Sequence, residues 1–499
     1  MRPLIKIAIA ILACGVLMTC NRASHRATEF QAVSVTHSLS LTDEMTPTIA
    51  SKPASLAVMT SEQATFLDRV AKDTWTYLSS DVATNHHMPW SWYSPEMTPT
   101  GGDFANPAEI GLYMLSYLAA YDMQKPWSPA WSSVEAEVAA TLDQLEAWQS
   151  GTQTSQPHGS NTYSNSVFYQ WYWVSWTPPV VGASDVDHVV TSIDNAWLAA
   201  SLITIREYAE ANGHPALAQQ ANGILQDMDF SLWYDGGQHR FRLGNTNDPQ
   251  GGVWADYYSN ENRVINFVAR TLGQLSPAEF QNSLDALVQA PGIYDRGTSD
   301  PGDDITVEKV AWDGSYFTYA APALFIREMN MPYGTGTIEP ATQGQIAYAQ
   351  DKGYTAWGLS DCYDTRDGSY VQQGAPPAAM PGSSETRPGL VTPHASGLAL
   401  ITPLASEAIT NLQVLSTTFL TLYHPAFGFR DSVMAKPDDP NYGVVSYRFT
   451  ALAQEWMFLS IVNAQTSFVW NYFYRDEGVV AAHADMFLKN KVYLPVVRK

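Results

Sequence analysis

Apolar residues recur at three- to four-residue spacing along most of the chain, from about residue 62 to residue 467. This period places them on one face of an α-helix, so the pattern predicts a largely helical protein. Residues 168–176 and 230–243 are instead interpreted as strands in hairpins. The pattern predicts roughly twelve helices, at residues 62–80, 106–123, 129–149, 192–212, 215–229, 260–273, 276–289, 314–329, 341–352, 394–403, 405–420 and 448–467.

The connections between these helices alternate in length. The short ones are 124–128, 213–214, 274–275, 330–340 and 404, and the long ones are 81–105, 150–191, 230–259, 290–313, 353–393 and 421–447. Helices that run alternately up and down place all the long loops at one end. Closing the pairs into a ring predicts an all-α fold, an (α/α)6 barrel or toroid with long loops and small β-hairpins on one face.

Each long loop leads into an even-numbered helix of the predicted inner ring. The starts of these helices carry Asp187, Asp194, Glu261, Asp313, His394 and Glu455, and the loops carry aromatic residues that include Trp173, Trp254, Tyr257, Tyr258 and Trp312. Such loops usually carry function. An acidic cleft lined by aromatic rings suits a glycoside hydrolase, which needs two carboxylates flanking a glycosidic oxygen.

Composition and charge narrow the possible partners. The 499-residue chain has 49 Asp and Glu against 27 Lys and Arg, a formal net charge of −22. Nucleic acids and anionic membrane surfaces bind basic patches, so the charge argues against both. A polysaccharide or oligosaccharide substrate is compatible with it. The common metal, nucleotide and serine-hydrolase motifs are missing from the sequence, so we expect no cofactor and no metal.

The two ends of the chain differ from the helical region. Residues 1–20 combine Arg2 and Lys6 with the apolar run Ile7–Met18, which is typical of a secretory signal. We expect either its cleavage or lipid attachment at Cys14 or Cys20. Residues 21–60 form a Ser/Thr-rich linker, residues 61–487 the barrel and residues 488–499 a basic tail. The expected protein is a secreted, periplasmic or cell-surface monomer, attached to a membrane only through an N-terminal lipid.

A series of motifs spanning residues 62–487 resembles a known family. The motifs are NPAEIGLYMLSYLAA, VTSIDNAWLAASLI, ADYYSNENRVINFVA, WDGSYFTYAAPAL, QIAYAQDKGYTAWGLSD, VTPHASGLAL, GFRDSV and ALAQEWMFLSIVNAQT. Their serial order is similar to that of the glucoamylase-like, or glycoamylase, domain. This domain occurs in bacterial endo-β-1,2-glucanases and in a transglycosylase part of cyclic β-1,2-glucan synthases. The resemblance implies an (α/α)6 barrel that cleaves internal linkages of a β-glucan, with β-1,2-glucan as the best match.

The resemblance implies catalytic roles for three acids. They are Asp194 in the SIDNA motif, Glu261 in the YYSNE motif and Asp431 in the GFRDSV motif. Members of the family use different acid and base arrangements. Which carboxylate donates the proton, and whether the reaction retains or inverts the sugar configuration, therefore stays open.

The sequence also departs from the family at three places. The stretch AWGLSDCYD puts Asp361 and Cys362 at altered positions, and Val190 and Trp197 stand where the glucanases carry acids near the SIDNA motif. The stretch QEW, which brings in Glu455, replaces a Gly-Pro-Ile element. Another β-glucan or a bacterial exopolysaccharide is therefore an alternative substrate.

Glu261 also has a purely structural interpretation. An acid after a Ser N-cap interacts favourably with the helix dipole, by up to about 1 kcal/mol. The dipole lowers a carboxyl pKa, whereas a general acid needs a raised one. Burial against Trp254, Tyr257 or Tyr258, or a nearby Asp194, would have to outweigh the dipole.

The other acids keep two interpretations each. Asp194 is either catalytic or a ligand for a substrate hydroxyl, and Asp431 is either the catalytic base or a turn residue. Asp313 is first an N-cap and second a substrate contact. Asp187 is either a surface-loop residue or a substrate contact.

Two polar residues of the later inner helices are interpreted as follows. His394 is more compatible with a hydrogen-bonded structural histidine than with an acid. Glu455 lies inside a helix, so its carboxylate needs Arg448 or a substrate hydroxyl as partner.

Two further functions remain as alternatives. The first is a non-catalytic surface protein that binds glycans on the same toroid. The second is a polysaccharide lyase with a Tyr or His base, for which Arg263 and Arg387 are the candidate ligands of a uronic acid.

Overall fold

The computed structural model describes residues 59–80, 84–85, 87–98, 100–151, 162–176, 179–183, 188–380 and 385–488. The predicted signal segment, almost all of the predicted linker and nearly all of the C-terminal tail lie outside the described residues. So does Asp187. Within the described residues, no helix is both long and apolar enough to cross a membrane.

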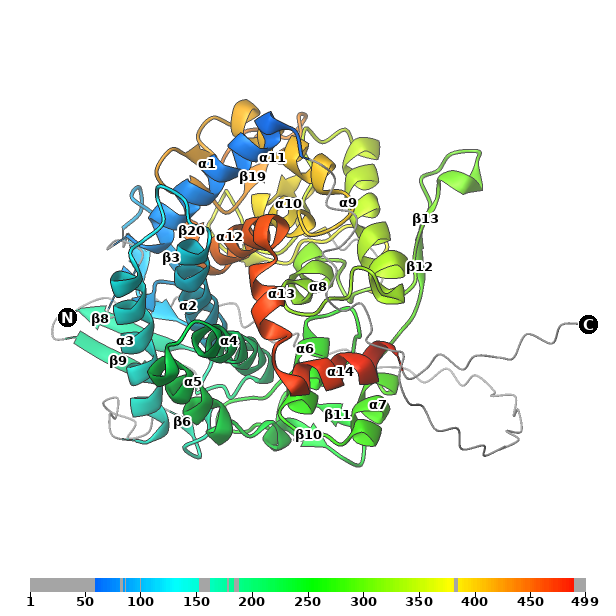
Figure 1. The fold of residues 1–499 in the computed structure, drawn as a ribbon. Coiled ribbons are helices and arrows are strands. Elements are labelled where there is room, and N and C mark those ends of the chain that lie inside the picture. The colour runs from blue at the N-terminus through cyan, green and yellow to red at the C-terminus, as the bar shows by residue number, and fades with distance from the viewer. Residues whose placement is uncertain are drawn as a thin grey trace, which may run out of the picture.

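Helices arranged in two concentric rings form the body of the molecule (Figure 1). Neighbouring inner helices contact one another around most of the ring, with α12 returning to α2. The inner helices are α2 (Pro107–Asp122), α4 (Ser192–Ala211), α6 (Asn262–Thr271), α8 (Tyr316–Ala320), α10 (Pro393–Ala399) and α12 (Ala451–Thr466). The outer helices are α1 (Ser61–Leu78), α3 (Trp131–Gln149), α5 (Pro215–Asp227), α7 (Pro277–Asp285), α9 (Glu339–Asp351) and α11 (Ala405–Thr418).

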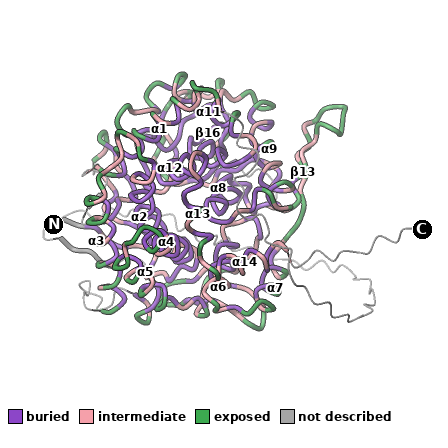
Figure 2. Tube along the Cα trace, in the orientation of Figure 1, coloured by how far each residue is buried: buried purple, intermediate pink, exposed green. Residues whose placement is uncertain are grey.

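Burial distinguishes the two rings, as Figure 2 shows. The inner helix α2 is buried on all sides from Pro107 to Ala120, which requires an apolar residue at almost every position. The outer helix α5 instead buries one stripe, which consists of Leu217, Ala218, Ala221, Ile224 and Leu225. This spacing is the three-to-four period of an amphipathic helix. The predicted all-α (α/α)6 barrel is therefore confirmed.

Two predicted inner helices are shorter in the structure. The predicted helix 314–329 becomes α8 followed by a 3-10 turn, Ala321–Leu324, which contains Pro322. The predicted helix 394–403 ends at Ala399, a few residues before Pro403. Proline has no backbone N–H and clashes with the preceding turn, so it disfavours continuation of a regular α-helix.

Two C-terminal helices that the periodicity did not predict close the plain end of the barrel. They are α13 (Phe468–Phe473) and α14 (Glu477–Phe487). The chain turns after α12 at Ser467, whose backbone is left-handed with φ 60°. In Figure 1, α13 crosses the middle of the view. The Trp470 indole N–H donates to the Ala323 carbonyl at 2.8 Å, which ties α13 to the turn after α8.

The strands are short, antiparallel and confined to the long loops. One sheet joins β5 (Phe104–Ala105), β8 (Tyr172–Trp176) and β9 (Pro179–Ala183), and another joins β20 (Phe449–Thr450), β3 (Trp92–Tyr93) and β4 (Gly101–Gly102). The two-stranded pairs are β1 (Thr84–Asn85) with β2 (Met88–Pro89), β6 (Thr162–Tyr163) with β7 (Val167–Phe168), β10 (Tyr234–Asp235) with β11 (Arg240–Phe241), β12 (Gly292–Tyr294) with β13 (Ile305–Val307), β14 (Cys362–Tyr363) with β15 (Tyr370–Val371), β16 (Leu390–Val391) with β19 (Val433–Met434), and β17 (Tyr423–His424) with β18 (Gly428–Phe429). The strands predicted at 168–176 and 230–243 are thus present in part.

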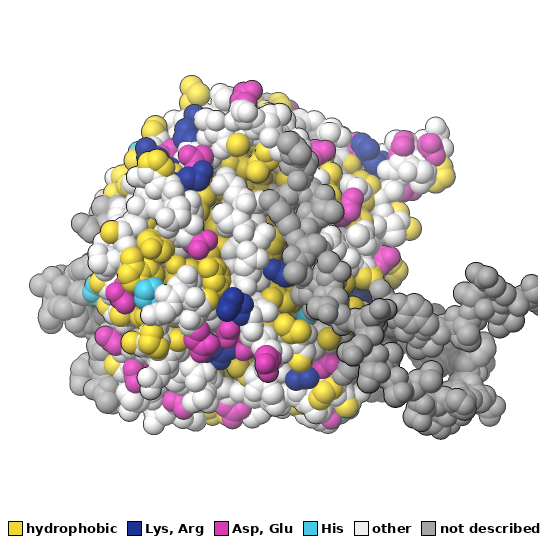
Figure 3. All heavy atoms as spheres, viewed as in Figure 1, with side chains coloured by type: hydrophobic (Ala, Val, Ile, Leu, Met, Phe, Trp, Pro, Cys, Tyr) yellow, Lys and Arg dark blue, Asp and Glu magenta, His cyan; other side chains and the backbone are white. Residues whose placement is uncertain are grey.

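The face seen in Figure 3 is the end that carries α13 and α14. Lys and Arg side chains lie on it among Asp and Glu side chains, with apolar side chains between them. The candidate site is built at the opposite end, where the inner helices begin.

Candidate active site

Glu261 stands at the N-cap position of α6, and its carboxylate turns away from the helix. It forms no side-chain capping bond, and its Oε2 accepts instead from the Trp197 indole N–H at 2.7 Å. The Ser N-cap expected from the sequence is not formed, because the Ser259 hydroxyl donates to the Lys309 carbonyl. The predicted Ser N-cap with an acid in the first turn is therefore wrong, since Glu261 itself occupies the N-cap position and the first turn of α6 carries no acid.

Burial, together with a smaller contribution from the neighbouring Asp194 charge, raises the pKa of Glu261 to about 8. The Trp197 hydrogen bond opposes this by stabilising the charged form. The side chain is only half-buried by accessible surface, although protein atoms surround it densely. In such an environment a carboxyl is both reachable and poorly hydrated.

Asp194 lies in the first turn of α4, as predicted, and faces the same region. Burial raises its pKa to about 7, while a hydrogen bond with Thr191 lowers it. The Asp194 charge contributes to the raised pKa of both Glu261 and Glu109. Inner helices α2, α4 and α6 therefore bring three carboxyl groups into electrostatic contact.

Asp313 and Asp361 form a second acidic pair beside Glu261. Asp313 Oδ1 accepts from the Ser315 N–H at 3.0 Å, and the Ser315 hydroxyl in turn accepts from the Asp361 N–H at 3.0 Å. Asp361 Oδ1 also accepts from the Gln373 N–H at 2.9 Å. Burial, then Asp313, and then Glu261 hold the pKa of Asp361 well above its usual range. Asp313 is not itself the N-cap, because Ser315 occupies that position of α8.

Two glycines let the loops of this pair interlock. Gly314 has φ 74°, and a Cβ there would lie 2.2 Å from the Ala375 carbonyl oxygen. A Cβ on Gly374 would lie 2.0 Å from the Asp313 carbonyl oxygen. Both contacts exclude any larger residue, so the positions of Asp313 and Asp361 depend on these glycines.

Asp431 lies in a different environment on the loop before β19. Its Oδ2 accepts from the Tyr363 N–H at 2.6 Å and its Oδ1 from the Thr450 hydroxyl at 3.0 Å. Burial raises its pKa to about 6, and these two bonds together with the Arg448 charge limit the increase. Asp431 is therefore the most readily ionised of the three predicted catalytic acids.

Asp361 connects the electrostatic environments of Glu261 and Asp431. Glu261 contributes to its raised pKa, and both Asp361 and Asp431 raise the pKa of Tyr370. The sequence had shown Asp361 only as a departure from the family pattern and not as a site residue. Its placement depends on the contact between the loops around residues 313 and 361, which lie far apart in the sequence.

Glu109 and Glu455 lie deeper, between α2 and α12. Glu109 forms a capping box with Asn106 and accepts from the Ser91 hydroxyl at 2.9 Å, and burial raises its pKa to about 8. Both carboxylate oxygens of Glu455 lack a partner among the described residues. Burial and then Glu109 raise the pKa of Glu455 well above its usual range. Glu109 was missed because its motif has the pattern of an ordinary capping box.

Arg448, which the sequence suggested as a partner for Glu455, lies elsewhere. Its guanidinium lies 4.7 Å from the Trp92 ring centroid and 4.1 Å from that of Tyr363. This position, between two aromatic rings, places the cation near Asp431. Glu455 is consequently a buried neutral acid rather than half of an ion pair.

The aromatic candidates divide into accessible and buried rings. Tyr257 and Trp312 are half-buried, with ring centroids 5.6 Å apart. Trp254 is half-buried as well, but the Arg242 guanidinium lies 3.2 Å from its ring centroid. Tyr258 is buried in the core, with the Lys309 ammonium 4.0 Å from its ring centroid. The ring that bonds to Glu261 is that of Trp197. It is not one of the three rings that the sequence suggested would bury this acid.

Two other predicted residues have their own positions. Trp173 is half-buried on β8, opposite Phe104 of β5, with ring centroids 6.0 Å apart. His394 is buried on α10, with its Nδ1 2.6 Å from the Thr392 hydroxyl. Burial lowers the pKa of His394 to about 3, so the imidazole is neutral at physiological pH.

The two arginines considered as ligands of a uronic acid both have acidic partners. Arg263 is fully buried and pairs with Glu328 at 2.6 Å, and Arg387 pairs with Asp364. Arg263 is therefore inaccessible to a uronic acid, and Arg387, which is 34% exposed, already has an acidic partner. Within the described ranges, His, Cys, Asp and Glu side chains form no group that could hold a metal ion.

The chain resembles the glycoamylase family, as predicted. A family model described as putative glucoamylase matches residues 301–477. A putative glucoamylase structure from Bacteroides caccae superimposes with a TM-score of 0.67 at 18% identity, covering 85% of this chain and 99% of that one. No curated protein matches the chain in sequence.

Two endo-β-1,2-glucanase structures are similar as well. The enzyme from Chitinophaga pinensis, solved with sophorotriose and glucose, has a TM-score of 0.66 at 14% identity and covers 85% of this chain and 98% of its own. The enzyme from Talaromyces funiculosus, solved with sophorose, has a TM-score of 0.65 at 13% identity and covers 86% of this chain and 91% of its own. At these identities the likeness establishes the fold.

Proposed function

We propose that the protein is a glycoside hydrolase that cleaves an internal linkage of a β-glucan, with β-1,2-glucan as the preferred substrate. The observation that carries the proposal is the difference between two carboxyl groups of one acid-rich region. Glu261 has a pKa of about 8 and Asp431 one of about 6. At neutral pH the first is therefore protonated and the second ionised, as an acid and a base must be.

In the proposed reaction Glu261 is the general acid. Its proton passes to the glycosidic oxygen as the bond from that oxygen to the anomeric carbon breaks. Asp431 takes a proton from the water that attacks the anomeric carbon, which makes Asp431 the general base. Asp194, Asp313 and Asp361 bind sugar hydroxyls, and Tyr257 and Trp312 offer their rings to a sugar face.

The substrate assignment rests on similar proteins. Two of the similar structures are endo-β-1,2-glucanases, and both were solved with β-1,2-linked glucose oligosaccharides or glucose. A neutral glucan also fits a site in which Arg263 and Arg387 are already paired with acids. This pairing weighs against the lyase alternative, whose uronic acid needs a cationic partner. We also propose that the protein works outside the cytoplasm, as its N-terminal residues suggest.

The purified full chain should be incubated with linear β-1,2-glucan and with β-1,3-, β-1,4- and β-1,6-glucans. We expect new reducing ends on the β-1,2-glucan, with oligosaccharides of several lengths as early products. If only another of these glucans is cleaved, the proposed substrate is wrong, but the protein is still a glycoside hydrolase. Glycan binding without any product would favour the non-catalytic alternative, and unsaturated products absorbing in the ultraviolet would favour the lyase.

A further inference from the structure

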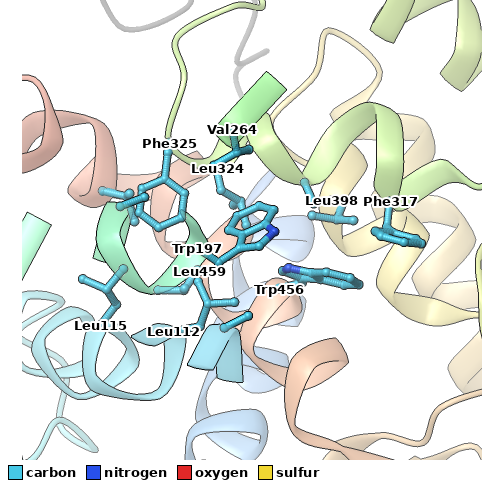
Figure 4. Packing of buried hydrophobic residues seen from close by; sticks show 14 of the residues in the cluster. Leu112, Leu115, Trp197, Val264, Phe317, Leu324, Phe325, Leu398, Trp456 and Leu459 are labelled. Carbon is cyan, nitrogen blue, oxygen red and sulfur yellow. The ribbon is translucent and has the colours of Figure 1, made fainter. Parts of the chain in front are cut away.

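Trp197 lies in the second turn of α4 with its ring inside the barrel. Only 1% of the side chain is exposed, and its ring packs edge-on against Phe325 with centroids 5.7 Å apart. Figure 4 shows it among buried leucines of α2, α12 and the turn after α8, of which Leu112, Leu459 and Leu324 are labelled. Such packing leaves a large ring a single rotamer. The direction of its N–H bond is therefore set by the core.

That N–H bond points at the carboxyl group of Glu261. The Trp197 Nε1 lies 2.7 Å from Glu261 Oε2, which is a short hydrogen bond for a nitrogen donor. An indole can only donate, so Oε2 must accept. In the neutral carboxylic acid the accepting oxygen is the carbonyl one, and the proton resides on Oε1. A donor-only partner thus decides which oxygen of Glu261 carries the proton.

We propose that Trp197 is a positioning residue for the proton donor, because its indole N–H holds the Glu261 carboxyl in one orientation and assigns the acidic proton to Oε1. The inference rests on the proposed function of Glu261.

The N-cap geometry makes this indole contact more important. Glu261 stands at the start of α6 and makes no bond to the free N–H groups of that helix. Without the indole, these N–H groups would be the nearest competing donors, because helix starts attract carboxylates. We therefore expect loss of the indole to let the carboxyl rotate toward the helix and away from the substrate.

The test compares Trp197→Phe with Trp470→Phe. Trp470 is a matched control, since its indole N–H is also buried and donates, in this case to the Ala323 carbonyl at 2.8 Å. For Trp197→Phe we expect kcat on the preferred glucan to fall about 10- to 100-fold, a part of the 10²–10⁴ that positioned proton transfer contributes. KM should change less than about threefold. Trp470→Phe should lower the melting temperature and leave kcat unchanged.

The pH profile distinguishes positioning from a loss of packing. The hydrogen bond stabilises ionised Glu261, so its removal should move the alkaline limb of kcat/KM to higher pH. An unshifted limb in Trp197→Phe together with an unchanged kcat would overturn the proposal. If Trp197→Phe does not fold, a tryptophan analogue with sulfur in place of the indole N–H keeps the ring volume and gives the same test.

A measurement without substrate separates this inference from the proposed function. The protonated carboxyl band of Glu261 can be followed by infrared spectroscopy as the difference between the native protein and Glu261→Gln. We expect Trp197→Phe to move the pH at which this band disappears upward, and Trp470→Phe to leave it in place. If the native protein cleaves no glycan, the proposed function fails while the band still decides whether the indole acts on Glu261. A band that titrates identically in both variants contradicts the inference.

Discussion

The surroundings of Glu261 and Asp431 differ although both are carboxyl groups of one acid-rich region. Glu261 accepts a hydrogen bond from an indole in the apolar core and has Asp194 and Asp313 as acidic neighbours. Asp431 receives a backbone N–H and a hydroxyl and lies near the Arg448 guanidinium. The first environment favours the neutral acid and the second the carboxylate. Two residues of similar chemistry thereby become suited to opposite roles.

The largest effect is expected from Glu261→Gln. The amide keeps the size and the bond to Trp197 but cannot donate an acidic proton, so kcat should fall by about 10⁴, at the upper end for general acid catalysis. Initial rates of reducing-end release measure it. Glu279→Gln, on the outer helix α7, is the control and should retain full activity. Turnover by Glu261→Gln at the native rate would remove Glu261 from the mechanism.

A somewhat smaller loss is expected from Asp431→Asn. The amide cannot accept a proton from water, so kcat should fall by about 10³ with KM little changed. Thr450→Val serves as a graded control, because it removes one hydrogen bond and keeps the carboxylate. We expect this control to lose about tenfold or less. If Asp431→Asn retained most of its activity while Asp194→Asn lost it, Asp194 would become the base.

The pH dependence of kcat/KM should form a bell. Asp431 must be ionised, so activity is present above its pKa of about 6 and is lost below it. Glu261 must be protonated, so activity is present below its pKa of about 8 and is lost above it. The optimum is therefore near neutral pH, and each pH unit beyond a limb should lower the rate about tenfold. A single plateau into the acidic range would show that Asp431 is not the group that must be ionised.

The smallest effect is expected from Arg448→Met, because Arg448 is the cation that distinguishes the surroundings of Asp431 from those of Glu261. Replacing Arg448 by Met removes the positive charge near Asp431, so the pKa of Asp431 and with it the acidic limb should move to higher pH. At neutral pH the rate should fall about 3- to 10-fold, because less of Asp431 is ionised. Arg296→Met, which breaks an exposed ion pair with Asp351, is the control and should leave the profile unchanged. A shift of the alkaline limb instead would connect Arg448 to Glu261.

The sequence predicted the rings of helices well because the outer helices carry a clear apolar stripe. It failed for α14 and for α13, whose six-residue run FVWNYF is shorter than the window over which a helical period can be recognised. These helices lie against α4, α6, α7 and α12, and the burial of Trp470 follows from contacts that no local pattern encodes. The end of α8 at Ala320, by contrast, follows from a local signal, because Pro322 cannot continue a regular α-helix.

The sequence by itself determined which acids stand at the starts of inner helices, because helix periodicity and loop length are local properties. Asp194 and Glu261 were identified in this way. It could not determine their protonation, which depends on how completely distant segments remove water from each carboxyl. The indole of Trp197, the Asp361 loop and the guanidinium of Arg448 reach the acids only after the ring has closed. Desolvation and charge interactions act through space, and for that reason only the tertiary structure decided which carboxyl keeps its proton.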